Sequence, residues 1–209
     1  MGSETDSLRV NAARADITPS TLLPLFGRAR RSGAARTIAS RLEANVLLFD
    51  APDGPAAIIA IDSLYSSQQL EDEVRRQTAA RGLSFSQGAL LFVASHTHNA
   101  PSLDPTKPRL GPFDVGYLDF AAARITEALL AARSQHTGVA HVAHGQALCA
   151  ASTFRRRAIV GIDLARLRVS KRVLMAPDAR VVIDQRLKLL LLSGADQGGG
   201  DGGTPAPAA

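Results

Sequence analysis

The sequence has 209 residues and a formal net charge of +5, from 24 lysines and arginines against 19 aspartates and glutamates. This length is sufficient for one domain with a hydrophobic core. The single cysteine, Cys149, excludes an intramolecular disulfide and a CxxC metal or redox motif. The apolar runs are too short to span a membrane, and no secretory signal is seen at the start, which favours a cytoplasmic protein.

The N-terminal part of the sequence predicts a strand followed by a loop. Residues 1–8 are expected to form a flexible N-terminus. Alternating apolar and polar residues predict a short strand over 8–12, and Pro19 stops it. The prolines, glycines and arginines of residues 20–38 predict an irregular loop.

A hairpin and a helix are expected next. Strands over residues 41–49 and 56–61 flank a turn at 50–55, which contains Pro and Asp-Gly in favourable positions. A helix is predicted over 66–81, with Gly82 as its stop.

The stretch with the clearest chemistry begins with five apolar residues, 89–93, which are typical of a strand buried on both faces. His96 and His98 follow directly. If the chain is still extended there, both imidazoles face the same side and can share a metal ion, or divide into one ligand and one proton donor. A strand–helix–strand crossover would place Asp62 at the same edge of the sheet. Two surface histidines in a loop would show the same pattern, and this alternative stays open.

The second half predicts a helix over 115–133, strands over 138–148 and 181–192, and a disordered Gly/Pro/Ala tail over 193–209. His141 and His144 stand three residues apart and would face opposite ways along a strand, which argues against their sharing a metal. The fold class expected is therefore α/β, a mixed β-sheet with flanking helices in a single incomplete domain over residues 9–192.

Several motifs occur in a characteristic order: Ala15-Asp16-Ile17-Thr18-Pro19, then Gly27, Arg41-Leu42-Glu43-Ala44, Ile61-Asp62 and Ser95-His96-Thr97-His98-Asn99-Ala100-Pro101. Their order and spacing resemble the N-terminal catalytic domain of neutral/alkaline (non-lysosomal) ceramidases. The resemblance extends over residues 9–192. Asn99 stands where that family has a serine, and Phe154 where it has an asparagine.

Members of that family are zinc amidases that cleave the N-acyl bond of ceramide and related N-acyl lipids. The resemblance implies that His96 is a zinc ligand and that His98 assists the tetrahedral intermediate or the leaving amine. It implies that Arg155, or Arg156 if the local alignment shifts, faces the substrate, and that Asp62 supports the site from behind the ligands. A bound zinc ion would polarise the amide carbonyl and lower the pKa of its water.

The sequence departs from the family at its end. The family's second zinc-binding histidine, in a His-Pro step, has no counterpart, nor has the later Gly-Asp-x-Ser-Pro segment with the remaining Glu and Tyr ligands. Since a catalytic zinc normally takes three protein ligands, we expect a partial enzyme domain that is inactive alone. A truncated gene, a frameshift or a split enzyme would each account for it. The edge where the missing half would dock should expose apolar surface and unpaired strand groups, so we expect poor solubility or self-association.

Two other functions are compatible with the sequence. One is a non-catalytic remnant of the same family that binds a lipid or a protein. The other is a basic nucleic-acid-binding protein, which the lack of a known motif and the few aromatic residues disfavour. Any affinity for DNA or RNA is expected to be weak, salt-dependent and without sequence preference.

Overall fold

A computed structural model describes residues 9–28, 33–51, 53–135, 139–163 and 168–194 of the chain. The expected N-terminal segment and most of the expected tail lie outside these residues. The chain divides into two compact units, one of residues 1–140 with 194–209 and the other His141–Ser193, and each is described by itself.

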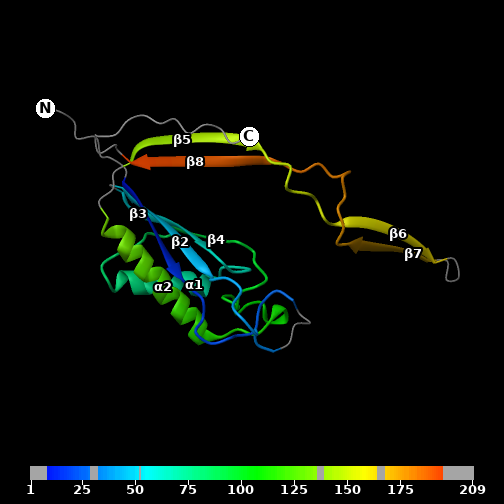
Figure 1. The fold of residues 1–209 in the computed structure, drawn as a ribbon, viewed down its shortest axis with the longest axis horizontal. Coiled ribbons are helices and arrows are strands. Elements are labelled where there is room, and N and C mark those ends of the chain that lie inside the picture. The colour runs from blue at the N-terminus through cyan, green and yellow to red at the C-terminus, as the bar shows by residue number, and fades with distance from the viewer. Residues whose placement is uncertain (1–8, 29–32, 52, 136–138, 164–167, 195–209) are drawn as a thin grey trace. The chain divides into compact units, whose positions relative to one another are not determined.

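A four-stranded sheet forms the centre of the first unit (Figure 1). Its strand order is β1-β2-β3-β4, with antiparallel pairing between β1 and β2 and between β2 and β3, and parallel pairing between β3 and β4. The predicted mixed α/β fold is therefore confirmed. The strands are β1 (Arg9–Asp16), β2 (Glu43–Ala51), β3 (Gly54–Ile61) and β4 (Leu90–Ala94).

The predicted hairpin is present, with a shorter connection than expected. Asp50 pairs with Pro55 and Ala51 with Gly54, so the strands continue into the predicted turn. Gly54 has a φ of +111°, which residues other than glycine adopt with strain.

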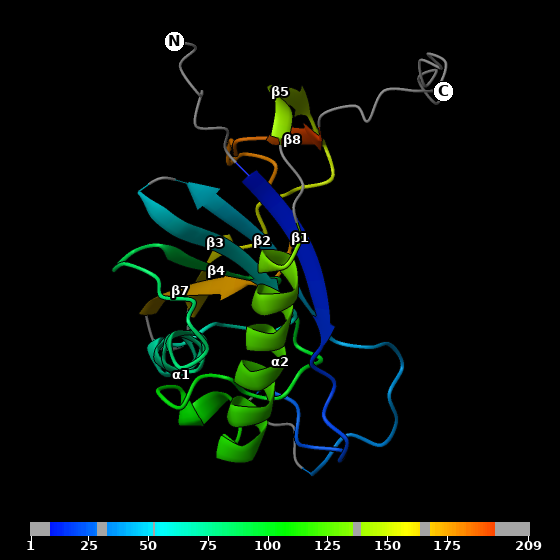
Figure 2. The ribbon, with the colours of Figure 1, turned by 90° about the vertical axis from the view of Figure 1, so that its left-hand side faces the viewer.

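Two helices pack against this sheet, α1 (Gln68–Ala79) and α2 (Val115–Arg133), and a short 3₁₀ helix, η1 (Pro108–Leu110), lies between them in the sequence. Figure 2 shows α2 beside β1 and β2. The buried side chains of the strands alternate with exposed ones, so the core lies between the helices and one face of the sheet. Its largest fully buried members include Ile59, Ile61, Leu70, Leu118 and Ile125.

One prediction about β4 is wrong. Its apolar run indicated a strand buried on both faces, but Leu91 is 54% exposed and Val93 46% exposed. The reason is that β4 is the last strand in the sheet order and that, within the described residues, helices cover only one face. Leu91 continues a row of pairs with Ile58, Leu47 and Ala12 across the open face.

The second unit contains two-stranded ribbons. β5 (Val139–Leu148) pairs with β8 (Arg186–Gly194), and β6 (Arg157–Asp163) pairs antiparallel with β7 (Arg168–Leu174). The strand expected over 181–192 begins only at Arg186, and it includes the first two residues of the expected tail. The β6–β7 hairpin is not among the elements predicted from the sequence.

Ser67 caps α1 and also holds the long loop that follows β4. Its hydroxyl oxygen accepts a hydrogen bond from the Leu70 amide at 3.1 Å and donates one to the Leu103 carbonyl at 2.6 Å. Ser67→Ala removes both contacts. We expect it to lower the free energy of unfolding by about 1–2 kcal/mol in urea denaturation.

Ser66→Ala is the matched control, because no side-chain hydrogen bond of Ser66 is found among the described residues. A Ser66→Ala effect equal to that of Ser67→Ala would show that the cap contributes nothing specific.

Candidate functional site

The predicted site lies at the carboxyl ends of two adjacent parallel strands. Asp62 directly follows β3, and the segment with both histidines follows β4. The Ser95 amide donates to the Ile61 carbonyl at 2.9 Å, so the two strand ends remain joined at this point. Ligands in open α/β sheets bind at this edge.

His96 and His98 lie next to each other, although the chain is not extended between β4 and His98. His96 has a φ of +60°, and it is the one non-glycine residue of the described part with a positive φ. The two ring centroids are 5.5 Å apart and the rings are nearly perpendicular. The premise of an extended chain is therefore wrong, while the expected proximity is found. Strained backbone of this kind is concentrated at functional sites.

Each imidazole is held by a contact between its own Nδ1 and a backbone carbonyl. His96 Nδ1 lies 3.0 Å from the Leu64 carbonyl oxygen, and His98 Nδ1 lies 3.0 Å from the Gly27 carbonyl oxygen. Because a carbonyl oxygen only accepts, each Nδ1 is assigned the proton and each Nε2 the lone pair. Metal-binding histidines commonly show this arrangement, in which the carbonyl fixes the tautomer and the ring orientation.

Gly27 is required by the close approach of His98. A Cβ at this position would lie 2.6 Å from His98 Nδ1 and 2.8 Å from Leu64 Cδ2, and the φ of +100° also favours glycine. The Phe26 amide donates to the Ala100 carbonyl at 2.9 Å, which joins the same two segments on the other side. The loop after β1 and the loop after β4 thus form one wall of the site.

A series of contacts that the sequence did not predict leads from His96 through Tyr65 to Lys107 and Asp104. The Tyr65 ring meets the His96 ring edge-on, with centroids 5.4 Å apart, and Lys107 Nζ lies 4.7 Å from the Tyr65 centroid. Lys107 also forms an ion pair with Asp104, whose side chain is 2% exposed. The only signal for this ion pair in the sequence is the position of Lys107 three residues after Asp104.

The pKa of the Asp104 carboxyl reflects two opposing effects. Burial raises it, but hydrogen bonds from Lys107 and from both the hydroxyl and the amide of Thr106 lower it, and the net direction is downward. A carboxyl with a folded-state pKa below its unfolded value stabilises the fold above that unfolded value, about 3.9. This stabilisation is lost as the pH falls through the folded-state pKa.

Asp62 makes a structural contact with the neighbouring strand. Its Oδ2 accepts a hydrogen bond from the Glu43 amide at 3.1 Å, at the start of β2. It also lies near Tyr117, whose hydroxyl is buried and has no hydrogen-bond partner among the described residues. Burial raises the pKa of Tyr117, and the charges of Asp62 and Asp16 raise it further. The supporting role of Asp62 beside the histidines stays a prediction.

Arg155 and Arg156 belong to the second unit, where both are exposed immediately before β6. Their predicted role toward the substrate stays a prediction. His144 is exposed on β5.

The donor set fits zinc only in part. His96 and His98 present two imidazole nitrogens of the correct type, but no group of three or more His, Cys, Asp or Glu able to hold a metal is found within the described residues. Since catalytic zinc sites normally use three protein ligands, this part of the chain supplies an incomplete set.

This fold is similar to that of neutral ceramidases. A crystal structure of neutral ceramidase from Pseudomonas aeruginosa matches with a TM-score of 0.64 at 14% identity, over 73% of this chain and 25% of that one. A ceramidase complexed with C2 matches with a TM-score of 0.63 at 14% identity, over 91% of this chain and 29% of that one. At this identity the likeness concerns the fold, and the chain spans less than a third of either ceramidase. No protein-family model and no curated protein sequence matches the chain.

A side chain at position 27 should collide with the His98 ring in addition to straining the backbone. Gly27→Ala combines the cost of a positive φ with a collision against His98, so we expect a loss of at least about 2 kcal/mol in unfolding free energy. Gly33→Ala is the matched control, because it has a φ of +79° and no atom within 4 Å of the added Cβ. It should cost about 1 kcal/mol and leave the His98 ring signals in NMR spectra unchanged. Equal effects of the two variants would contradict the close packing of Gly27 and His98.

Lys107→Met should leave the buried Asp104 carboxylate with fewer partners. We expect a loss of about 1–3 kcal/mol at neutral pH, and acid unfolding that begins at higher pH because the folded-state pKa of Asp104 rises. Urea denaturation between pH 3 and 7 measures both effects. The double variant Asp104→Asn/Lys107→Met should recover part of the stability, and Lys188→Met, at an exposed position on β8, should change little. An unchanged acid transition in Lys107→Met would disprove the coupling.

Proposed function

We propose that this chain forms part of a ceramidase-like, zinc-dependent amide hydrolase that acts on N-acyl lipids. The observation that carries the proposal is the pair of histidines at the end of the β3–β4 edge, each fixed through Nδ1 by a backbone carbonyl. It lies in a fold similar to that of neutral ceramidases. No described helix is long and apolar enough to cross a membrane.

The two histidines take different roles in this proposal. His96 holds the metal through Nε2, where the bound ion would polarise the substrate carbonyl. With the remaining ligands present, His98 would transfer a proton at its Nε2, with its ring orientation fixed by the Gly27 carbonyl. In the chain alone, the same nitrogen is the second imidazole donor available to the metal. By the resemblance, Arg155 or Arg156 would stabilise negative charge on the substrate oxygen. Tyr65 meets the His96 ring edge-on, and Lys107 lies over the Tyr65 ring.

The chain alone should bind zinc weakly and should not release fatty acid from an N-acyl sphingosine. Two imidazoles leave most of the coordination sphere to water, so the geometry needed for catalysis is not fixed. The remaining ligands would come from the part of a ceramidase that this chain does not cover. The substrate class and the partner are inferred from the resemblance and the fold.

The test is a zinc titration of the purified full chain by isothermal calorimetry, followed by metal analysis after dialysis. We expect weak binding, zinc lost on dialysis, and an affinity reduced at least about ten-fold by His96→Ala or His98→Ala. His144→Ala, which removes an exposed histidine of the second unit, should leave the affinity unchanged.

Two results would contradict this proposal in different ways. If His96→Ala, His98→Ala and His144→Ala all keep the zinc affinity of the unmodified protein, His96 and His98 do not bind the metal. Stoichiometric zinc after dialysis, together with fatty-acid release that His96→Ala abolishes, would show that the chain already contains a complete catalytic site.

A further inference from the structure

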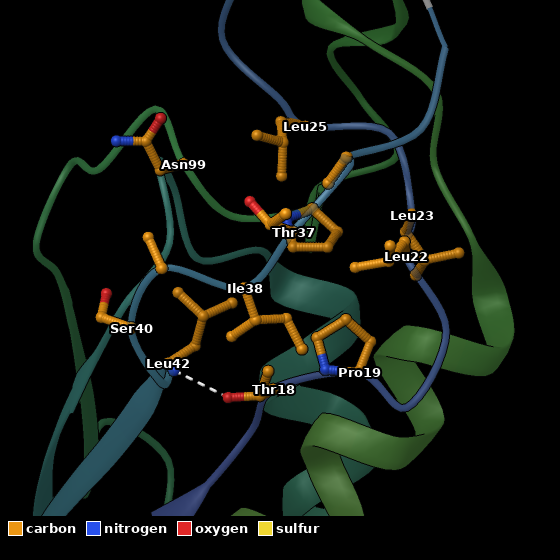
Figure 3. A pocket seen from close by; sticks show the side chains of 13 residues that line it. Thr18, Pro19, Leu22, Leu23, Leu25, Thr37, Ile38, Ser40, Leu42 and Asn99 are labelled. Atoms are coloured by element: carbon orange, nitrogen blue, oxygen red, sulfur yellow. Dashed lines mark hydrogen bonds between the residues drawn. The ribbon is translucent and has the colours of Figure 1, made fainter.

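A cavity of about 320 Å³ adjoins the histidine segment (Figure 3). The loop between β1 and β2 provides most of its lining residues, and Asn99 and Pro101, from the loop after β4, provide the others. Its main apolar lining residues are Leu22, Leu23, Leu25, Ile38 and Leu42.

The lining has a simple chemical character. None of the thirteen residues that line the cavity is charged. Side-chain polar groups come from Thr18, Thr37, Ser40 and Asn99. Thr18 is already engaged, since its hydroxyl oxygen accepts a hydrogen bond from the Leu42 amide at 2.8 Å (Figure 3). An uncharged and largely aliphatic ligand fits this lining, because an ionised group would lose its hydration without gaining a partner.

The cavity and the histidines share the same two loops. Asn99 follows His98 directly, and Leu25 precedes the Phe26-Gly27 step. Phe26 N donates to the Ala100 carbonyl, and Gly27 O lies against His98 Nδ1. A molecule seated in the cavity is therefore close to the loop that carries the histidines.

We propose that this cavity binds one aliphatic acyl chain of medium length. Its volume is at the lower end of the range for small-molecule sites, roughly 300–1,000 Å³, which suits one alkyl chain better than the two chains of a ceramide. Leu22 is 40% exposed and Ile38 is 48% exposed, so an inserted chain covers apolar surface that otherwise contacts water. The role of this cavity as the acyl pocket of a hydrolase rests on the proposed function. Binding of an acyl chain in the cavity does not depend on that function.

Direct binding measurements test the inference without requiring catalysis. Full-length protein in the presence of EDTA is titrated with N-acetyl-, N-octanoyl- and N-palmitoylethanolamine by isothermal calorimetry, below their micelle concentrations. Each buried methylene should increase affinity about four-fold, so the octanoyl compound should bind at least about a hundred-fold more tightly than the acetyl compound. The palmitoyl chain should gain little over the octanoyl chain, since the cavity is then full.

Two variants locate the binding. Ile38→Asp places a charge in the cavity wall, and Leu22→Trp fills part of its volume; both positions are partly exposed, which favours folding. Each should weaken octanoyl binding at least about ten-fold with an unchanged circular dichroism spectrum. Leu91→Asp is the matched control, since it introduces a charge on a different apolar surface of this unit, the open face of the sheet, and it should have no effect.

The opposite results would overturn the inference. Affinity that keeps rising from octanoyl to palmitoyl, or that falls only in Leu91→Asp, would place the chain on an open surface. Because EDTA is present, octanoyl binding with no zinc affinity at the histidines would refute the proposed function alone. Zinc binding without octanoyl binding would refute the acyl pocket alone.

Discussion

The hydrogen bond between His98 Nδ1 and the Gly27 carbonyl is the contact on which the geometry of the site depends. It joins the loop after β1 to the loop after β4, two segments 71 residues apart in the sequence. It also selects the tautomer of His98 and brings the backbone so close that only glycine fits. The close contact between Gly27 and His98 therefore couples the orientation of the His98 ring to the packing of the two loops, which also line the cavity.

The elements that could be predicted are those with a strong local pattern. The β2–β3 hairpin, both helices and the placement of Asp62 and the histidine segment at one edge of the sheet followed from apolar periodicity and from the crossover rule. The residue type before an apolar helical stretch placed the start of α1 at the serines 66–67, and the structure shows that Ser67 is the cap. The pairing of His96 with His98 was expected, but for a reason that the positive φ of His96 contradicts.

What could not be predicted depends on contacts between distant residues. The Asp104–Lys107–Tyr65 chain is formed where two loops meet, and loops carry no periodic signal. An apolar strand such as β4 has the same sequence pattern whether one face or both faces are covered, so its exposure was not foreseen. The burial of the Tyr117 hydroxyl near Asp62 likewise depends on how α2 lies against the sheet.

Because β4 lies at the end of the strand order, the histidine segment that follows it can open independently of the rest of the fold. Five residue pairs with β3 set its register, and no other described strand pairs with the opposite edge of β4. Edge strands open more readily than central ones, and local opening does not require the whole core to unfold. Amide hydrogen exchange at Leu90–Ala94 would then report how often the strand that precedes the two histidines detaches from β3. Opening of this one short strand can therefore disturb the site while the helices and the other three strands stay folded.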